Sequence, residues 1–126
     1  MEISIVILNY KTAGLVKQSL INLHNEPFSV AYEIIVVDDG STDDTGKVSE
    51  NHKVTVLRHL INLGKGAALK PGCDFAYAHG ADAFVLLDSD GQHDPKEIPR
   101  FVKELETADI VFGYRKFDKR MPLVLR

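Results

Sequence analysis

The segment Ile3–Leu8 reads ISIVIL and is apolar at nearly every position, which is typical of a strand buried on both faces of a sheet. A second run, Tyr32–Val37 (YEIIVV), has the same character. A longer stretch follows each of them. Thr12–Asn25 carries apolar residues at helical spacing, and Ser41–Glu50 is polar and weakly helical. This alternation predicts strand-helix-strand units with right-handed crossovers.

The alternation continues to the end of the chain. Further strands are expected at Val54–Leu57, Ala83–Leu87 and Ile110–Phe112, and further helices at Lys65–His79 and Pro95–Thr107. We expect Pro71 to kink the first of these helices or to restart it, and Asp94 to cap the second. The pattern predicts an α/β fold with a mostly parallel sheet covered by helices on both faces.

Length and composition fit a soluble globular protein with one ordinary core. The chain has 126 residues, of which 44% are hydrophobic and 26% charged. Its apolar runs are far shorter than the ~20 residues that cross a bilayer, and its first residues do not resemble a signal peptide. The single cysteine, Cys73, excludes an internal disulfide framework. We therefore expect a cytoplasmic location.

Charge is distributed unevenly along the chain. The net charge of −3 argues against a nucleic-acid partner, but residues Arg115–Arg126 carry five basic side chains and one acid. Such a tail is either a solvated end or a contact for anionic phosphate, including lipid at the cytoplasmic face of a membrane. The sequence leaves both interpretations open.

Polar residues follow three of the expected strands. The first strand leads into Asn9 and Tyr10, and the second into Asp38-Asp39-Gly40. The fourth leads into Asp88-Ser89-Asp90. Ligands of open parallel sheets bind beyond the carboxyl ends of the strands. The sequence therefore predicts a binding site at that edge.

The strongest single motif is LLDSDGQHDP at Leu86–Pro95. Alternation along the strand places the carboxylates of Asp88 and Asp90 on one side, where they repel each other unless a cation lies between them. Hard oxygen ligands of this kind suit Mg²⁺ or Mn²⁺. The alternative is a turn whose acids only precede the next helix.

Two further motifs are weaker when each is taken alone. VVDDGSTDDT at Val36–Thr45 is compatible with an ordinary turn or with a carboxylate offered to a base or a ribose. NLGKGAAL at Asn62–Leu69 places glycines and a lysine before a helix, where phosphate binds favourably. Its spacing matches neither a P-loop nor a dinucleotide fingerprint.

Taken together and in order, these motifs resemble the family 2 glycosyltransferases of the GT-A fold. The resemblance rests on VILNY at Val6–Tyr10, the three motifs above, and FGYR at Phe112–Arg115. Within the family, GKGAAL and DSDGQHDP are most similar to the dolichyl- and polyprenyl-phosphate mannose or glucose synthases.

The resemblance implies a site for a UDP- or GDP-hexose. It implies that Asp39 contacts the base, that Lys65 and Arg115 lie near the diphosphate, and that Mg²⁺ or Mn²⁺ is the cofactor. The implied metal ligands are Asp88, Asp90 and Gln92. The implied nucleotide-sugar site comprises Leu8, Asn9, Tyr10, Asp39, Gly64, Lys65, Asp88, Ser89, Asp90 and Arg115.

Members of this family are usually much longer. Residues 1–126 are therefore expected to be the nucleotide-sugar-binding part of a GT-A domain, as a form truncated at the C-terminus or a degenerate homologue. The expected reaction is an inverting hexose transfer, with a lipid phosphate among the candidate acceptors. No residue has the context of a catalytic base, so the catalytic residue is left unassigned.

A phosphoacceptor receiver domain of a signalling system is the alternative. Asp38-Asp39, Asp88 and Lys116 imitate its acid pair, its phosphorylated aspartate and its lysine. Receivers, however, carry the acid pair after their first strand, and here a complete strand-helix unit precedes it. The Gly-Lys-Gly segment would also have no role in a receiver.

Overall fold

The computed structural model describes residues 1–44, 47, 52, 54–89, 91 and 93–114. The chain divides into two compact units, Met1–Lys96 and Glu97–Arg126. None of the helices in these described ranges is long and apolar enough to cross a bilayer. The expected helix at Ser41–Glu50 and the basic tail from Arg115 lie mainly or wholly outside the described residues, and Ser41–Asp44, which are described, are not helical.

The first unit contains a four-stranded sheet. Its strands lie in the order β3-β2-β1-β4, and every neighbouring pair is parallel. Leu8 of β1 lies opposite both Val37 of β2 and Asp88 of β4, so these three strands end level with one another. The strands are β1 (Glu2–Asn9), β2 (Ala31–Asp38), β3 (Thr55–Arg58) and β4 (Ala83–Asp88).

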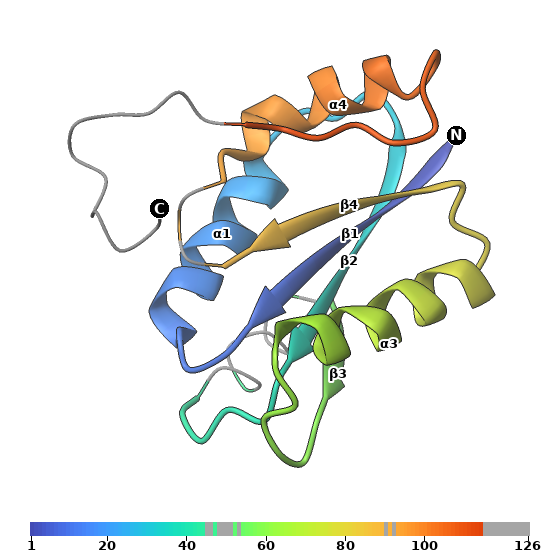
Figure 1. The fold of residues 1–126 in the computed structure, drawn as a ribbon. Coiled ribbons are helices and arrows are strands. Elements are labelled where there is room, and N and C mark those ends of the chain that lie inside the picture. The colour runs from blue at the N-terminus through green and yellow to red at the C-terminus, as the bar shows by residue number, and fades with distance from the viewer. Residues whose placement is uncertain (45–46, 48–51, 53, 90, 92, 115–126) are drawn as a thin grey trace. The chain divides into compact units, whose positions relative to one another are not determined.

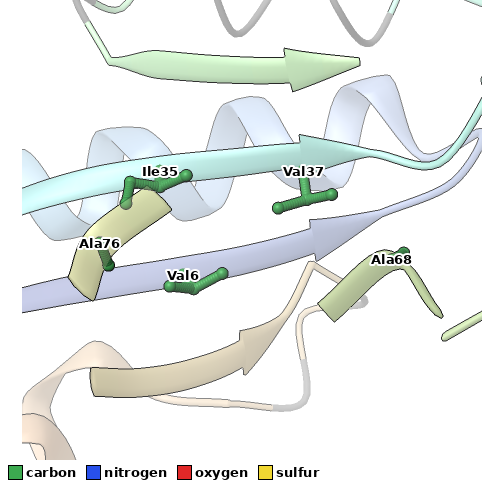
Figure 2. Close-up of a cluster of buried hydrophobic side chains, with 5 residues drawn as sticks. All are labelled: Val6, Ile35, Val37, Ala68 and Ala76. Atoms are coloured by element: carbon green, nitrogen blue, oxygen red, sulfur yellow. The ribbon is translucent and has the colours of Figure 1, made fainter. Parts of the chain in front are cut away.

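Helices cover both faces of this sheet, as the sequence predicts. Helix α1 (Ala13–Asn25) lies on one face and α3 (Lys65–Ala78) on the other (Figure 1). The isoleucines at positions 3, 5 and 7 of β1 are fully buried, and burial of each such side chain contributes roughly 1.5–3 kcal/mol. The cluster on the α3 side is Val6, Ile35, Val37, Ala68 and Ala76 (Figure 2).

Helix α3 packs closely on the sheet because its inner residues are small. A Cβ atom added to Gly72 would lie 2.7 Å from a methyl of Val6 and 2.8 Å from a methyl of Val37. Pro71 lies inside α3, which is a single helix from Lys65 to Ala78, so the expected restart is wrong. Proline removes one backbone donor, and the packing of Ala68, Gly72 and Ala76 holds both halves of the helix against the same two strands.

Asp94 caps the helical segment that follows β4. Its carboxylate accepts a hydrogen bond of 3.0 Å from the backbone N–H of Lys96, and a 3₁₀ turn, η1 (Pro95–Glu97), begins at the next residue. Proline is favoured at such a first position because its missing N–H has no partner there anyway. Helix α4 (Ile98–Glu104) follows, and it is shorter than the expected helix at Pro95–Thr107.

The expected strand at Ile110–Phe112 is not formed. These residues belong to the second unit, and they have no ladder partner among the described residues. The side chains of Ile110 and Phe112 are 70% and 86% exposed. A strand is defined by hydrogen bonds to a neighbouring strand, and an apolar run indicates burial without supplying that neighbour.

Candidate functional site

A cavity of about 340 Å³ lies at the carboxyl ends of β1, β2 and β4, where the sequence predicts a site. Eight of the predicted site residues line it together. Thr12 and Asn62 also line it, although neither was predicted. The full lining is Leu8, Asn9, Tyr10, Thr12, Asp39, Asn62, Gly64, Lys65, Asp88 and Ser89. The other predicted residues, Asp90, Gln92 and Arg115, lie outside the described residues.

The signals for the two missed residues were present in the sequence. Asn62 is the first residue of the NLGKGAAL motif, and Thr12 directly precedes α1. A threonine directly before a helix is typical of an N-cap, yet the Thr12 side chain makes no cap hydrogen bond and donates to the side chain of Asn9 instead. Only the three-dimensional arrangement distinguishes the two roles.

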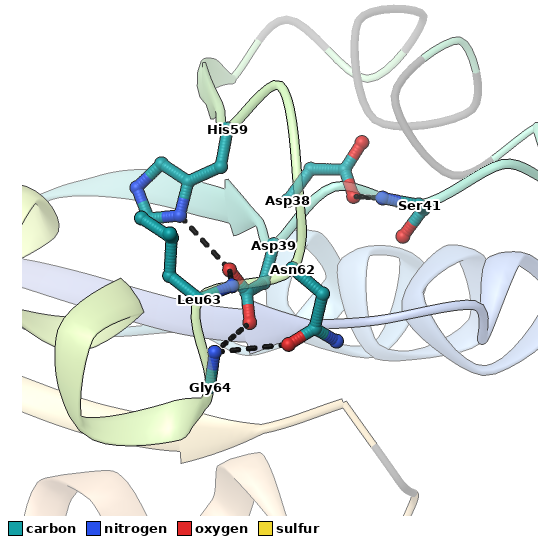
Figure 3. Close-up of polar contacts among 7 residues, drawn as sticks. All are labelled: Asp38, Asp39, Ser41, His59, Asn62, Leu63 and Gly64. Carbon is teal, nitrogen blue, oxygen red and sulfur yellow. Dashed lines mark hydrogen bonds and ion pairs between the residues drawn. The ribbon is translucent and has the colours of Figure 1, made fainter.

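Asp39 anchors the loop between β3 and α3 (Figure 3). One carboxylate oxygen, Oδ1, accepts hydrogen bonds of 2.9 Å from the backbone N–H of Leu63 and from Nδ1 of His59. The other, Oδ2, accepts a bond of 3.0 Å from the N–H of Gly64, which also donates to Oδ1 of Asn62. The residue is only 3% exposed. Its carboxylate thus fixes the residues that lead into α3.

These contacts determine the ionisation of Asp39. Burial alone would raise the pKa of its carboxyl group, because a charge is poorly solvated there. The hydrogen bonds from Leu63, His59 and Gly64 stabilise the charged form and outweigh that effect, so the pKa lies below its ordinary value. Asp39 therefore stays ionised inside the wall of the cavity.

Gly40 lets the same loop approach the end of β2. Its φ is +74°, a left-handed conformation that glycine adopts without strain. A Cβ atom at this position would lie 2.4 Å from the carbonyl carbon of Ile61 and 2.5 Å from the nitrogen of Asn62. The backbone of the loop thus rests directly on Gly40, which brings Asn62 to the cavity.

A buried polar cluster joins β1, β4 and the start of α1. The side-chain oxygen of Asn9 accepts hydrogen bonds from the hydroxyls of Thr12 and Ser89, and these two hydroxyls are 3.0 Å apart. Nδ2 of Asn9 has no hydrogen-bond partner among the described residues, although Asn9 is buried and lines the cavity. A buried donor normally has a partner, so within the described part of the chain this amide is an unsatisfied polar group in the wall of the cavity.

Asp88 differs from Asp39 in its surroundings. Its Oδ2 lies 2.6 Å from Nζ of Lys65, and the two side chains are 30% and 67% exposed. The backbone N–H of Asp88 donates a hydrogen bond of 2.9 Å to Nδ1 of His93. Asp88 lines the cavity, and the charge of its carboxylate is balanced by one long, exposed side chain.

The described residues are compatible with a divalent cation at this position. Mg²⁺ is commonly held by one or two carboxylates together with substrate phosphates, and Asp88 supplies one carboxylate at the cavity. No group of three or more histidine, cysteine or acidic side chains that could hold a metal occurs among the described residues. The expected ligands Asp90 and Gln92 lie outside that part of the chain.

Comparison with known proteins identifies the family. The model of glycosyl transferase family 2 matches residues 4–123, which is nearly the whole chain. The chain belongs to glycosyl transferase family 2. This membership confirms the resemblance seen in the motifs and favours a transferase over the receiver-domain alternative.

Two relatives illustrate the relationship. A protein of Methanocaldococcus jannaschii, MJ1222, is 36% identical over 99% of this family 2 chain and 53% of its own length. The dolichol-phosphate mannosyltransferase of Pyrococcus furiosus is 32% identical over 91% of this chain and 33% of its own length. Relatives therefore include a dolichol-phosphate mannosyltransferase, as the GKGAAL and DSDGQHDP motifs indicate. The chain spans about half or less of the length of these relatives.

A solved structure has the same fold. Glucosyl-3-phosphoglycerate synthase of Mycobacterium tuberculosis, in complex with Mn²⁺, uridine diphosphate and glucosyl-3-phosphoglycerate, matches with a TM-score of 0.68 and 26% identity. The match covers 86% of this chain and 40% of that one. It confirms the expected GT-A-like α/β architecture of this family 2 member.

Proposed function

We propose that this chain is the nucleotide-sugar-binding part of a glycosyltransferase that transfers a hexose, with inversion, from a UDP- or GDP-sugar to a polyprenyl phosphate. The observation that carries the proposal is the cavity of about 340 Å³ at the ends of three parallel strands, lined by the residues that the motifs select. A similar structure contains Mn²⁺ and uridine diphosphate, and a relative is a dolichol-phosphate mannosyltransferase.

The nucleoside would lie at the side of the cavity formed by Asp39, Asn9 and Tyr10. A carboxylate oxygen accepts up to two hydrogen bonds, and within the described residues Oδ2 of Asp39 accepts only that from Gly64. It can therefore accept a further bond from the N–H of a base. The amide of Asn9 would donate to an oxygen of the nucleoside, and the half-exposed ring of Tyr10 offers an apolar wall.

The diphosphate would lie between the start of α3 and the end of β4. Lys65 supplies a positive charge there, and we assign the same role to Arg115 from the sequence. A divalent cation, Mg²⁺ or Mn²⁺, would be held by Asp88, Asp90 and Gln92. The chemistry that such a cation supplies when bound is neutralisation of the charge that develops on the leaving diphosphate.

The name of one relative, a dolichol-phosphate mannosyltransferase, supports a phosphate acceptor. A sugar hydroxyl has to lose a proton and normally needs a general base. A phosphate monoester, whose second pKa is about 6, is largely ionised at neutral pH and needs none. We therefore favour a lipid phosphate as acceptor, with the basic residues from Arg115 onward as its contact or as a peripheral membrane contact.

The test is a calorimetric titration of the chain with UDP-glucose and with GDP-mannose, each with and without Mn²⁺. Binding of one donor that depends on Mn²⁺ is expected, and Asp90→Asn should abolish that dependence because a hard anionic ligand is lost. Asp74→Asn is the matched control, since Asp74 is an exposed acid on α3 that pairs with Lys70 away from the cavity. If neither UDP-glucose nor GDP-mannose binds, the proposal is wrong.

A further inference from the structure

Lys65 and Asp88 differ in how firmly each is held. Asp88 ends β4, lies in register with Leu8 of β1, and donates its backbone N–H to His93. Lys65 is the first residue of α3, and its side chain is 67% exposed. Four flexible methylene groups carry its ammonium. Asp88 is therefore the fixed partner of the pair, and Lys65 the one that can move.

The ion pair engages one of the two carboxylate oxygens that Asp88 could offer to a cation. Nζ of Lys65 lies 2.6 Å from Oδ2 of Asp88, and both residues line the cavity. Asp39 is the other acid that lines the cavity, and it accepts hydrogen bonds from two backbone N–H groups and from His59. These donors belong to the segment between β3 and α3, so none of them can be displaced unless that segment moves. Among the described residues of the cavity, Asp88 is thus the carboxylate whose neutralising partner is easily displaced.

We propose that Lys65 is an exchangeable counter-cation. Without ligand, the ammonium of Lys65 neutralises the carboxylate of Asp88. When a divalent cation and a nucleoside diphosphate are bound, this carboxylate would hold the cation, and the ammonium of Lys65 would contact the diphosphate. The inference rests on the proposed function and adds a positioning role for Lys65. An ammonium and a divalent cation on the same oxygen repel each other, so the free lysine opposes binding of the metal alone. The diphosphate removes this opposition by attracting the lysine.

This exchange predicts that one substitution changes two affinities in opposite directions. Lys65→Gln removes the competing ammonium, so the affinity for Mn²⁺ in the absence of nucleotide should rise about thirty-fold, the effect of one unit charge on a divalent cation roughly 4 Å away at the dielectric constant of water. The affinity for uridine diphosphate at saturating Mn²⁺ should fall about five-fold or more, because a phosphate contact is lost. Mn²⁺ binding is measured from the electron paramagnetic resonance signal of free Mn²⁺, and nucleotide binding by calorimetry.

Two further variants serve as controls. Lys65→Arg keeps the charge and should keep the weak Mn²⁺ binding of the wild type. Lys70→Gln removes a lysine of α3 that pairs with Asp74 outside the cavity, so it makes the same change in net charge and should alter neither affinity.

The outcomes separate this inference from the proposed function. Mn²⁺ affinity that is unchanged or lower in Lys65→Gln, or undetectable in both proteins, overturns the exchange, whatever the nucleotide does. Wild-type protein that binds neither uridine diphosphate nor guanosine diphosphate with Mn²⁺ overturns the proposed function. An equal rise of Mn²⁺ affinity in Lys70→Gln would assign the effect to net charge, and this too would overturn the exchange.

Discussion

Asp39 and Asp88 both follow or end a parallel strand and line the same cavity, yet their surroundings are opposite. Asp39 is buried and accepts hydrogen bonds from two backbone N–H groups and a histidine. Asp88 is part-exposed, and its carboxylate faces one lysine. Within the described part of the chain, the first carboxylate holds the loop that forms the cavity wall and keeps one acceptor position on Oδ2, whereas the second is paired only with an exposed side chain. Two acids at one edge of a sheet can thus differ in how far the protein itself already engages their charge.

The largest expected effect is on stability at the first acid. Asp39→Ala leaves the N–H groups of Leu63 and Gly64 and the ring of His59 without their acceptor, and it should lower the free energy of unfolding by about 3 kcal/mol. Asp88→Ala removes a part-exposed ion pair and should change the free energy of unfolding by about 0.5 kcal/mol or less. Urea denaturation measures both. Equal losses would show that the two acids do not differ as their contacts indicate.

A smaller loss of stability is expected at the contact between Gly40 and the loop. Gly40→Ala and Gly80→Ala both place alanine at a positive φ, but only at Gly40 would the new Cβ meet backbone, 2.4 Å from the carbonyl carbon of Ile61. Nothing lies within 4 Å at Gly80. The shared strain cancels in the comparison, so Gly40→Ala should destabilise by about 2 kcal/mol more than Gly80→Ala. Thermal or chemical denaturation of the two variants measures this difference in stability.

The second acid should affect binding more than stability. Asp88→Asn keeps the shape of the side chain and removes its charge, so the affinity for uridine diphosphate with Mn²⁺ should fall about ten-fold, or ~1.4 kcal/mol. The melting temperature without ligand should hardly change, while the Mn²⁺-dependent rise caused by nucleotide should shrink. A large loss of stability together with wild-type affinity would assign Asp88 a structural role instead.

The smallest effect is expected on the pH dependence of stability that Asp39 causes at acidic pH. The pKa of Asp39 is lowered in the folded protein, so its folded carboxyl group binds protons less readily than the unfolded one. Its contribution to stability is therefore complete above the unfolded pKa, about 4, and is lost as the pH falls further toward the folded value. Asp39→Asn should flatten the decline in stability below about pH 4, measured by denaturation at several pH values. Asp74→Asn is the control at an exposed acid. Below about pH 4, the stability of this variant should fall more steeply with decreasing pH than that of Asp39→Asn.

Much of the fold could be predicted because its causes are local. The apolar runs that became β1 and β2 lie within a residue or two of the expected ranges, and Asp94 caps the 3₁₀ turn before α4 as its position before Pro95 indicates. The strand expected at Ile110–Phe112 is not formed, because its cause would not be local. Its apolar residues were evident, but a strand also needs a neighbour, and a neighbour is a property of the tertiary structure.

Which side chains reach the cavity from the strand ends could be predicted from the order of the residues. Asn9, Asp39 and Asp88 end or follow apolar strand segments, and the carboxyl ends of parallel strands meet at one edge, so their proximity follows from pattern alone. The role of each side chain at the cavity, in contrast, depends on contacts between segments that are distant in the sequence. The loop before α3 closes onto Gly40 and brings its N–H groups to Asp39, whereas α3 begins where the ammonium of Lys65 pairs with the carboxylate of Asp88. The charge that remains available to a ligand depends on these long-range contacts, which no local pattern encodes.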